Sequence, residues 1–138
     1  MSKLTRENAV VPLTAGMDLT GYTGCPVFID NDGNAVVILE PSARPYGVLV
    51  TEGKEGEQVT VAMWGCGGTV KARIAVGSPL PAGHTIVIGS TFEDSIAFTH
   101  EPDNAMALFD RIAARLVAPA DSSGLHEVVL MNPQWVDV

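Results

Sequence analysis

Glycine and proline recur along this 138-residue chain between short apolar runs, and this spacing limits its possible folds more than any other feature. The 14 glycines and nine prolines are spread over the chain rather than gathered in one linker. Both residues interrupt helices and mark turns, so short apolar runs between them are typical of an all-β protein. We therefore predict a mainly β fold, a small β-barrel or β-sandwich with at most one short helix.

Several of these runs fit β-strands joined by tight turns. Asp32-Gly33 can supply the positive φ of a hairpin turn, so we predict a first hairpin from residues 27 to 29 and 35 to 40. The run from 70 to 76 alternates apolar and polar side chains, which is the pattern of a strand with one buried face. Further strands are predicted at residues 46 to 50, 59 to 64, 85 to 88, 95 to 99 and 125 to 131.

The segment from 103 to 117 fits two interpretations. Its apolar residues have helical spacing as far as Leu116, but a strand from Arg111 to Val117 also fits. We predict a short helix near residues 103 to 110 and a strand after it. The first 24 residues contain few strand signals, so we predict an extended N-terminal arm over residues 1 to 24 and a single β domain over residues 25 to 138.

The charge balance argues against nucleic acid as a partner. Eight lysines and arginines face 16 aspartates and glutamates, a net charge of -8, and no basic cluster exists to contact phosphates. Residues 74 to 92 contain no charged side chain, but prolines and glycines interrupt them, so we predict no membrane span. The polar N-terminus predicts no secretory signal and synthesis in the cytoplasm.

Motifs that would hold a metal or a cofactor are incomplete. A calcium loop beginning at Asp30 would need Gly and Glu where Ala35 and Pro41 stand, so we favour a hairpin turn there. His100-Glu101 has no second histidine at the spacing of a zinc protease. We therefore predict no metal, no cofactor and no catalytic residues, and we expect Cys25 and Cys66 to be reduced thiols.

The composition also predicts a protein partner. Apolar residues make up 46% of the chain and charged residues 17%, so some apolar surface should be covered by another chain. Large aromatic side chains are enriched at the centres of interfaces. The candidate interface residues are Tyr46, Trp64 and Trp135, together with the apolar middle of the arm, Val10, Val11 and Leu13.

Three successive sequence segments in the middle of the chain, called phrases below, resemble those of a known family. They span residues 46 to 50, 56 to 61 and 67 to 73, and the closing strands near 112 to 116 and 127 to 130 fit as well. Together they resemble the head decoration, or capsid cement, proteins of tailed bacteriophages. The resemblance implies a small β-barrel or β-sandwich, commonly a homotrimer, that lies on the outside of an icosahedral shell and ties major capsid subunits together without an active site.

The function that follows is a non-enzymatic capsid decoration protein. Its expected partners are the major capsid protein and further copies of itself, and its expected location is the outer capsid surface of the virion. Two alternatives stay open. One is a small cysteine-dependent enzyme in which Cys66, set between glycines, is activated by a histidine brought close by folding. The other is a β domain of a phage tail or baseplate.

Overall fold

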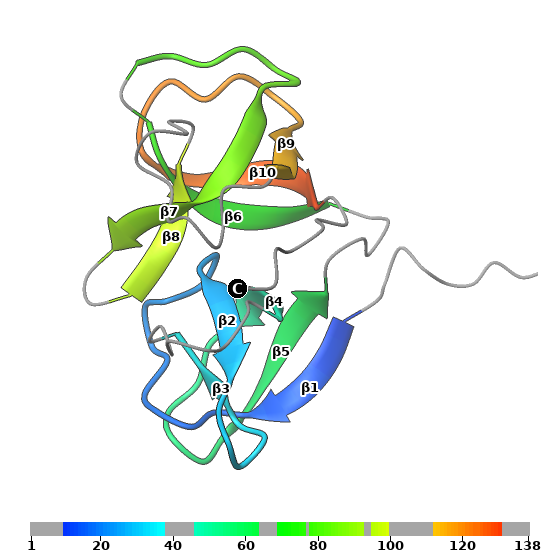
Figure 1. Cartoon of the computed structure of the whole chain (residues 1–138), viewed down its shortest axis with the longest axis vertical. Coiled ribbons are helices and arrows are strands. Elements are labelled where there is room, and N and C mark those ends of the chain that lie inside the picture. Colours follow the sequence, from blue (N-terminus) through cyan, green and yellow to red (C-terminus); the bar gives the residue numbers. More distant parts are fainter. Residues whose placement is uncertain are drawn as a thin grey trace, which may run out of the picture.

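The structure is a computed structural model that describes residues 10–37, 46–63, 69–76, 78–92, 95–99 and 112–130. Within these ranges, every element of regular secondary structure is a β-strand, which confirms the predicted all-β fold. The strands form two lobes, one before residue 64 and one after residue 68 (Figure 1).

The first lobe is a five-stranded antiparallel sheet in the order β1-β5-β4-β2-β3. At one end of the sheet, Ala15 forms a parallel bridge with Ala35, and Gly16 donates its N–H to the carbonyl oxygen of Ala35 at 2.8 Å. The sheet therefore curls around its own apolar side chains. Its strands are β1 (Val10–Thr14), β2 (Pro26–Ile29), β3 (Ala35–Val36), β4 (Gly47–Thr51) and β5 (Gln58–Met63).

The second lobe is a closed ring of five strands in the order β10-β6-β8-β7-β9, because β9 also pairs with β10. Every pairing in the ring is antiparallel except that of β6 with β8. A ring of this kind leaves no unpaired sheet edge. Its strands are β6 (Thr69–Ala75), β7 (Thr85–Phe92), β8 (Ser95–Thr99), β9 (Ile112–Leu116) and β10 (Gly124–Leu130).

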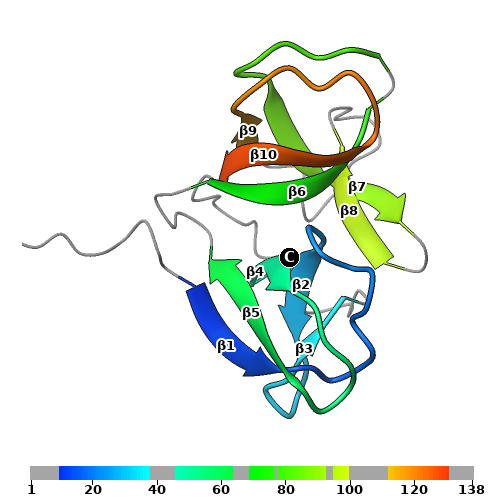
Figure 2. The same cartoon turned by 180° about the vertical axis from the view of Figure 1, so that it is seen from behind.

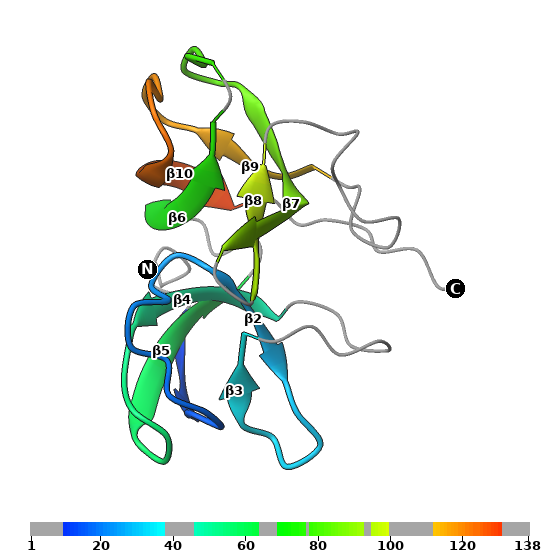
Figure 3. The ribbon, with the colours of Figure 1, turned by 90° about the vertical axis from the view of Figure 1, so that its left-hand side faces the viewer.

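The lobes share a hydrophobic core. Successive residues of a strand point to opposite faces, and in β4 both faces are buried. Leu49 packs in a cluster inside the first lobe, whereas Val48 belongs to a second cluster with Phe28 of β2 and Ile74 and Ile86 of the second lobe. Figure 3 shows why: β2 and β4 lie on the side of the first lobe that is nearest to the second. The single β domain over residues 25 to 138 stays a prediction.

A close backbone contact at Gly24 also joins the lobes. The N–H of Arg73 in β6 donates to the carbonyl oxygen of Gly24 at 2.9 Å. A Cβ on Gly24 would lie 2.8 Å from that same nitrogen and would clash with Cδ2 of Leu125 in β10. Figure 2 shows β6 and β10 side by side at the base of the second lobe, directly above β2 and β4. Glycine is thus the residue that this approach of two chain segments requires.

The first hairpin is confirmed. β2 and β3 are antiparallel, and the Asp30 carboxylate accepts hydrogen bonds at 2.9 Å from the backbone N–H groups of Asp32 and Asn34. Gly33 has a φ of 84°, the conformation that the Asp-Gly pair predicts. β3 ends at Val36, and residues 38 to 40 of the predicted strand lie outside the described residues.

The other predicted strands are also found, with β6 as the clearest example. Its inward residues Ala72 and Ile74 are buried, and Lys71 on the opposite side is exposed. The strand predicted after residue 110 is β9, whereas the predicted helix near residues 103 to 110 lies outside the described residues.

The predicted N-terminal arm needs correction for residues 10 to 24. β1 pairs with β5 along its whole length, and Leu19 is fully buried, with its N–H donating to the carbonyl oxygen of Gly53 at 2.8 Å. Pro12 argues against a strand in the sequence, because proline cannot donate a backbone hydrogen bond. An edge strand tolerates proline, because only one of its sides has to pair. Residues 1 to 9 lie outside the described residues.

Candidate interaction surface

β10 presents apolar side chains on both faces of the second lobe. Val128 and Leu130 point into the ring and are buried, while Leu125 and Val129, which alternate with them, are each 39% exposed. Val117, just after β9, is 44% exposed, and its N–H donates to the carbonyl oxygen of Glu127 at 3.0 Å. Val117 and Val129 therefore lie on the outside of the lobe, and Leu125 lies at the end of the same surface that meets Gly24 of the first lobe.

Two exposed cations flank the apolar residues. Arg115 of β9 pairs with Val129, and Lys71 of β6 pairs with Glu127, so both stand directly across from β10. Side chains of directly opposed residues in a sheet project from the same face. We define the outer face as the surface formed by Lys71, Arg115, Val117, Leu125, Glu127 and Val129.

Glu127 is an acidic residue within the outer face. The hydroxyl of Thr69, on the neighbouring strand β6, donates a hydrogen bond to its carboxylate. Lys71 lies directly across from Glu127 in the strand register. The outer face therefore keeps a positive balance among its charged residues, although the chain as a whole carries a net charge of -8.

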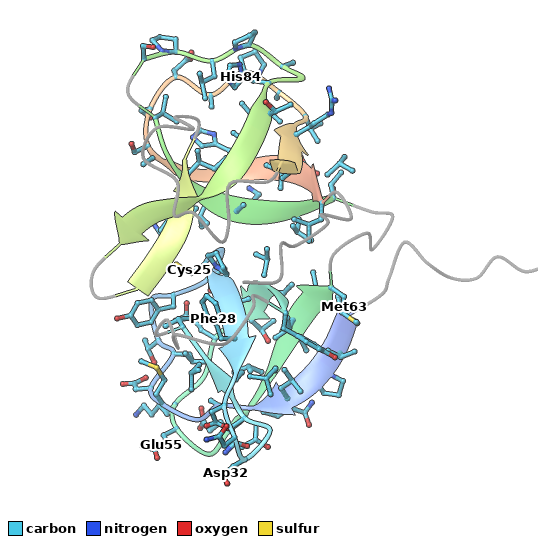
Figure 4. All side chains as sticks on the ribbon, in the orientation of Figure 1. Cys25, Phe28, Asp32, Glu55, Met63 and His84 are labelled. Carbon is cyan, nitrogen blue, oxygen red and sulfur yellow. The ribbon has the colours of Figure 1, made fainter. Side chains whose placement is uncertain are left out.

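The first lobe has the opposite charge at the end far from the second lobe. Figure 4 shows two of its carboxylates, Asp32 and Glu55, at the lower tip of the molecule. Among the described residues of the first lobe, the only lysine or arginine is Lys54, which precedes Glu55 in the chain. Like charges gathered on loops create a local negative potential. We define the acidic end by its carboxylates, which are Asp18, Asp30, Asp32, Glu55 and Glu57.

Local hydrogen bonds position several of these carboxylates. Glu57 accepts one from the backbone N–H of Lys54 at 2.8 Å. Asp18 accepts hydrogen bonds from the side chain and the backbone of Thr20, which together lower the pKa of Asp18 from its usual value. Hydrogen bonds to the charged form of a carboxylate favour that form. These hydrogen bonds stabilise the turns that carry the carboxylates. Within the described ranges, no group of three or more His, Cys, Asp or Glu residues could hold a metal ion.

The interface residues expected from the sequence lie partly elsewhere. Val10 is exposed on the edge strand β1, whereas Val11 and Leu13 of the same strand and Tyr46 are partly buried against the cluster inside the first lobe. These four residues are therefore on the first lobe and away from the outer face. The predicted interface tryptophans, Trp64 and Trp135, lie outside the described residues.

The sequence reasoning missed the apolar residues of the outer face. The run Val128-Val129-Leu130 indicates an exposed apolar side chain, because three successive apolar residues in a strand cannot all point inward. Once the strand is assigned, either Val129 or the pair Val128 and Leu130 must face outward. The strand pattern alone does not say which of the two faces lies inside the ring.

The described thiol and histidines do not form a cluster. Cys25 is fully buried at the start of β2, and His84 lies near the opposite end of the second lobe (Figure 4). His126 has its ring Nε2 2.6 Å from the carbonyl oxygen of Ser122. Cys66 and His100, which the cysteine-enzyme alternative also involves, lie outside the described residues.

Comparisons of this chain with models of known protein families and with curated proteins find no match. None of the structure's described segments is a helix with the length and apolar character needed to cross a membrane.

Proposed function

We propose that this protein is a non-enzymatic decoration protein that binds the outside of an assembled tailed-phage head as an oligomer and stabilises the shell. Its partners on the head are the major capsid protein and further copies of itself. The observation that carries the proposal is the outer face, where Val117, Leu125 and Val129 are exposed around Glu127 on a hydrogen-bonded sheet. Such a surface is typical of a site that another protein covers.

The resemblance to capsid cement proteins supports the same function. Its phrases fall on consecutive strands: residues 46 to 50 belong largely to β4, residues 56 to 61 lead into β5, and residues 69 to 73 belong to β6. β4 and β5 are neighbours in the first sheet, and β4 contacts β6 across the junction of the lobes. The phrases therefore lie together in the fold, as expected of one structural motif.

Co-sedimentation with purified phage heads tests this function. We expect the protein to pellet with assembled, expanded heads and to stay in the supernatant with unassembled capsid subunits, because many weak contacts add up only on an assembled shell. Protein that stays in the supernatant with intact heads of its own phage, at micromolar concentration, would overturn the proposal. A six-fold ring in solution would instead favour a tail or baseplate component.

The N-terminal residues can be tested in the same assay. Deleting residues 1 to 9 leaves β1 intact, since that strand begins at Val10. We expect the shortened protein to keep its melting temperature and to bind heads more weakly, as follows if these residues act as the arm that reaches a neighbouring subunit. A variant with the same residues in scrambled order is the matched control, and equal binding by all three proteins would exclude a role for this segment.

A further inference from the structure

The outer face differs in charge from the rest of this acidic protein. The described lysines and arginines are Lys54, Lys71, Arg73 and Arg115, and all but Lys54 belong to β6 and β9. The cations of the outer face lie beside its exposed apolar residues. A surface with this combination fits a partner that presents carboxylates, because complementary charges steer two surfaces together and apolar contact then holds them.

The acidic end of the first lobe has the complementary chemistry. Asp32 lies in the turn between β2 and β3, and Glu55 lies in the turn between β4 and β5. Both side chains are exposed and extend from the lower tip of the molecule (Figure 4). Both carboxylates can therefore reach another molecule.

We propose that the outer face of one copy of this protein binds the acidic end of a second copy. In this contact, Lys71 and Arg115 meet the turns that carry Asp32 and Glu55. The inference concerns contacts between copies in solution, and it holds whether or not the protein binds phage heads.

The positions of the two surfaces explain why the contact is between molecules. The acidic end is at the tip of the first lobe, whereas the outer face belongs to the second lobe, so one molecule cannot bring its own two surfaces together (Figure 1). A contact between two different surfaces of the same chain is heterologous, and it closes into a ring when the rotation between neighbours allows. Each copy in such a ring uses both surfaces.

Charge exchange between the two surfaces tests this contact. Lys71→Glu with Arg115→Glu makes the outer face acidic, like the acidic end, and Asp32→Lys with Glu55→Lys places two cations at the positions that would face Lys71 and Arg115. We expect each double variant to associate at least about tenfold more weakly than the unmodified protein, since several attractive pairs become repulsive. Light scattering and sedimentation velocity at low ionic strength measure the association, and circular dichroism shows whether each variant is folded.

Mixing the two double variants provides the decisive result. In an equimolar mixture, the unmodified acidic end of the first variant can meet the unmodified outer face of the second, so we expect association to return in the mixture and to weaken again at high salt. A variant with all four substitutions should also associate by itself. The proposal is overturned if the unmodified protein is a monomer, if either double variant keeps the unmodified mass, or if the mixture does not associate.

Lys54→Glu is the matched control for the effect of net charge. It changes the total charge as much as Lys71→Glu does, but it lies within the acidic end and makes that surface more acidic. We expect Lys54→Glu to leave association unchanged or stronger, and Lys71→Glu to weaken it. Equal weakening by the two variants would show that general repulsion, rather than contact between these surfaces, controls the assembly.

Discussion

Replacing Gly24 by alanine tests the junction between the two lobes. Gly24 has a φ of 90°, which costs a non-glycine residue about 1–2 kcal/mol. The new Cβ would lie 2.8 Å from the backbone nitrogen of Arg73, so the two segments must move apart. That movement weakens the hydrogen bond from Arg73 to Gly24, about 1 kcal/mol, and disturbs packing between the lobes by about 1–3 kcal/mol. We therefore expect a loss of about 3–6 kcal/mol in the free energy of unfolding.

Gly21→Ala separates the backbone cost from the steric cost. Gly21 has nearly the same φ, 88°, but a Cβ there would have no neighbour within 4 Å. We expect this variant to lose only about 1–2 kcal/mol, the backbone cost alone. Urea unfolding followed by tryptophan fluorescence gives both values, provided that the dependence of stability on urea stays the same in the two variants.

The side chain of Leu125 provides a second check on the junction. Its Cδ2 atom would clash with the new Cβ, and it is the flexible end of a partly exposed side chain. Leu125→Ala should therefore cost less stability in the Gly24→Ala background than in the unmodified protein, because it removes part of the clash. Equal stability losses in Gly21→Ala and Gly24→Ala would refute the close approach of the lobes.

Three further predictions concern single side chains. Ile74→Asp places an unpaired charge in the shared core and should lower the free energy of unfolding by about 3–5 kcal/mol. Lys71→Gln, on the exposed side of the same strand, should change it by less than about 0.5 kcal/mol. Thermal unfolding of both variants checks which face of β6 is buried. Asp30→Ala removes the acceptor for two backbone N–H groups and should lower stability by about 1–2 kcal/mol in urea, with Asp30→Asn recovering most of the loss. The pKa of Asp18 is lowered in the folded protein, so the stabilising effect of its carboxylate should be present above the ordinary aspartate pKa and lost as the pH falls through the lowered value. The urea midpoint of Asp18→Asn should therefore depend less on pH across that range than the urea midpoint of the unmodified protein.

Local chemistry explains which elements could be predicted from the sequence. The Asp-Gly turn specifies its own hairpin, and the alternation in β6 identifies the side that is buried. β1 could not be recognised in the same way, because its pairing with β5 joins residues about 50 positions apart and proline stands in its middle. The parallel contact of β6 with β8 and the closing contact of β9 with β10 are likewise set by tertiary packing.

The candidate surface was less predictable than the fold. An exposed valine and a buried valine are the same residue in the sequence, and only the closure of the ring decides that Val128 points inward and Val129 outward. The placement of Lys71 and Arg115 on one face also depends on register, because each reaches the outer face through its own pairing with β10. Charge counted along the chain shows an acidic protein, and the arrangement in space separates a positive face from a negative end.

The junction between the lobes connects stability with assembly. In the proposed contact, each molecule uses one surface from each lobe, so the angle between successive copies depends on how rigidly the lobes are joined. A fixed angle gives one closed ring, whereas a variable angle gives chains of different lengths. The shared cluster and the hydrogen bond from Arg73 to Gly24 hold that angle. We therefore expect Gly24→Ala, at a temperature where it remains folded, to replace a single oligomer mass with a broad distribution, while Gly21→Ala keeps the single mass.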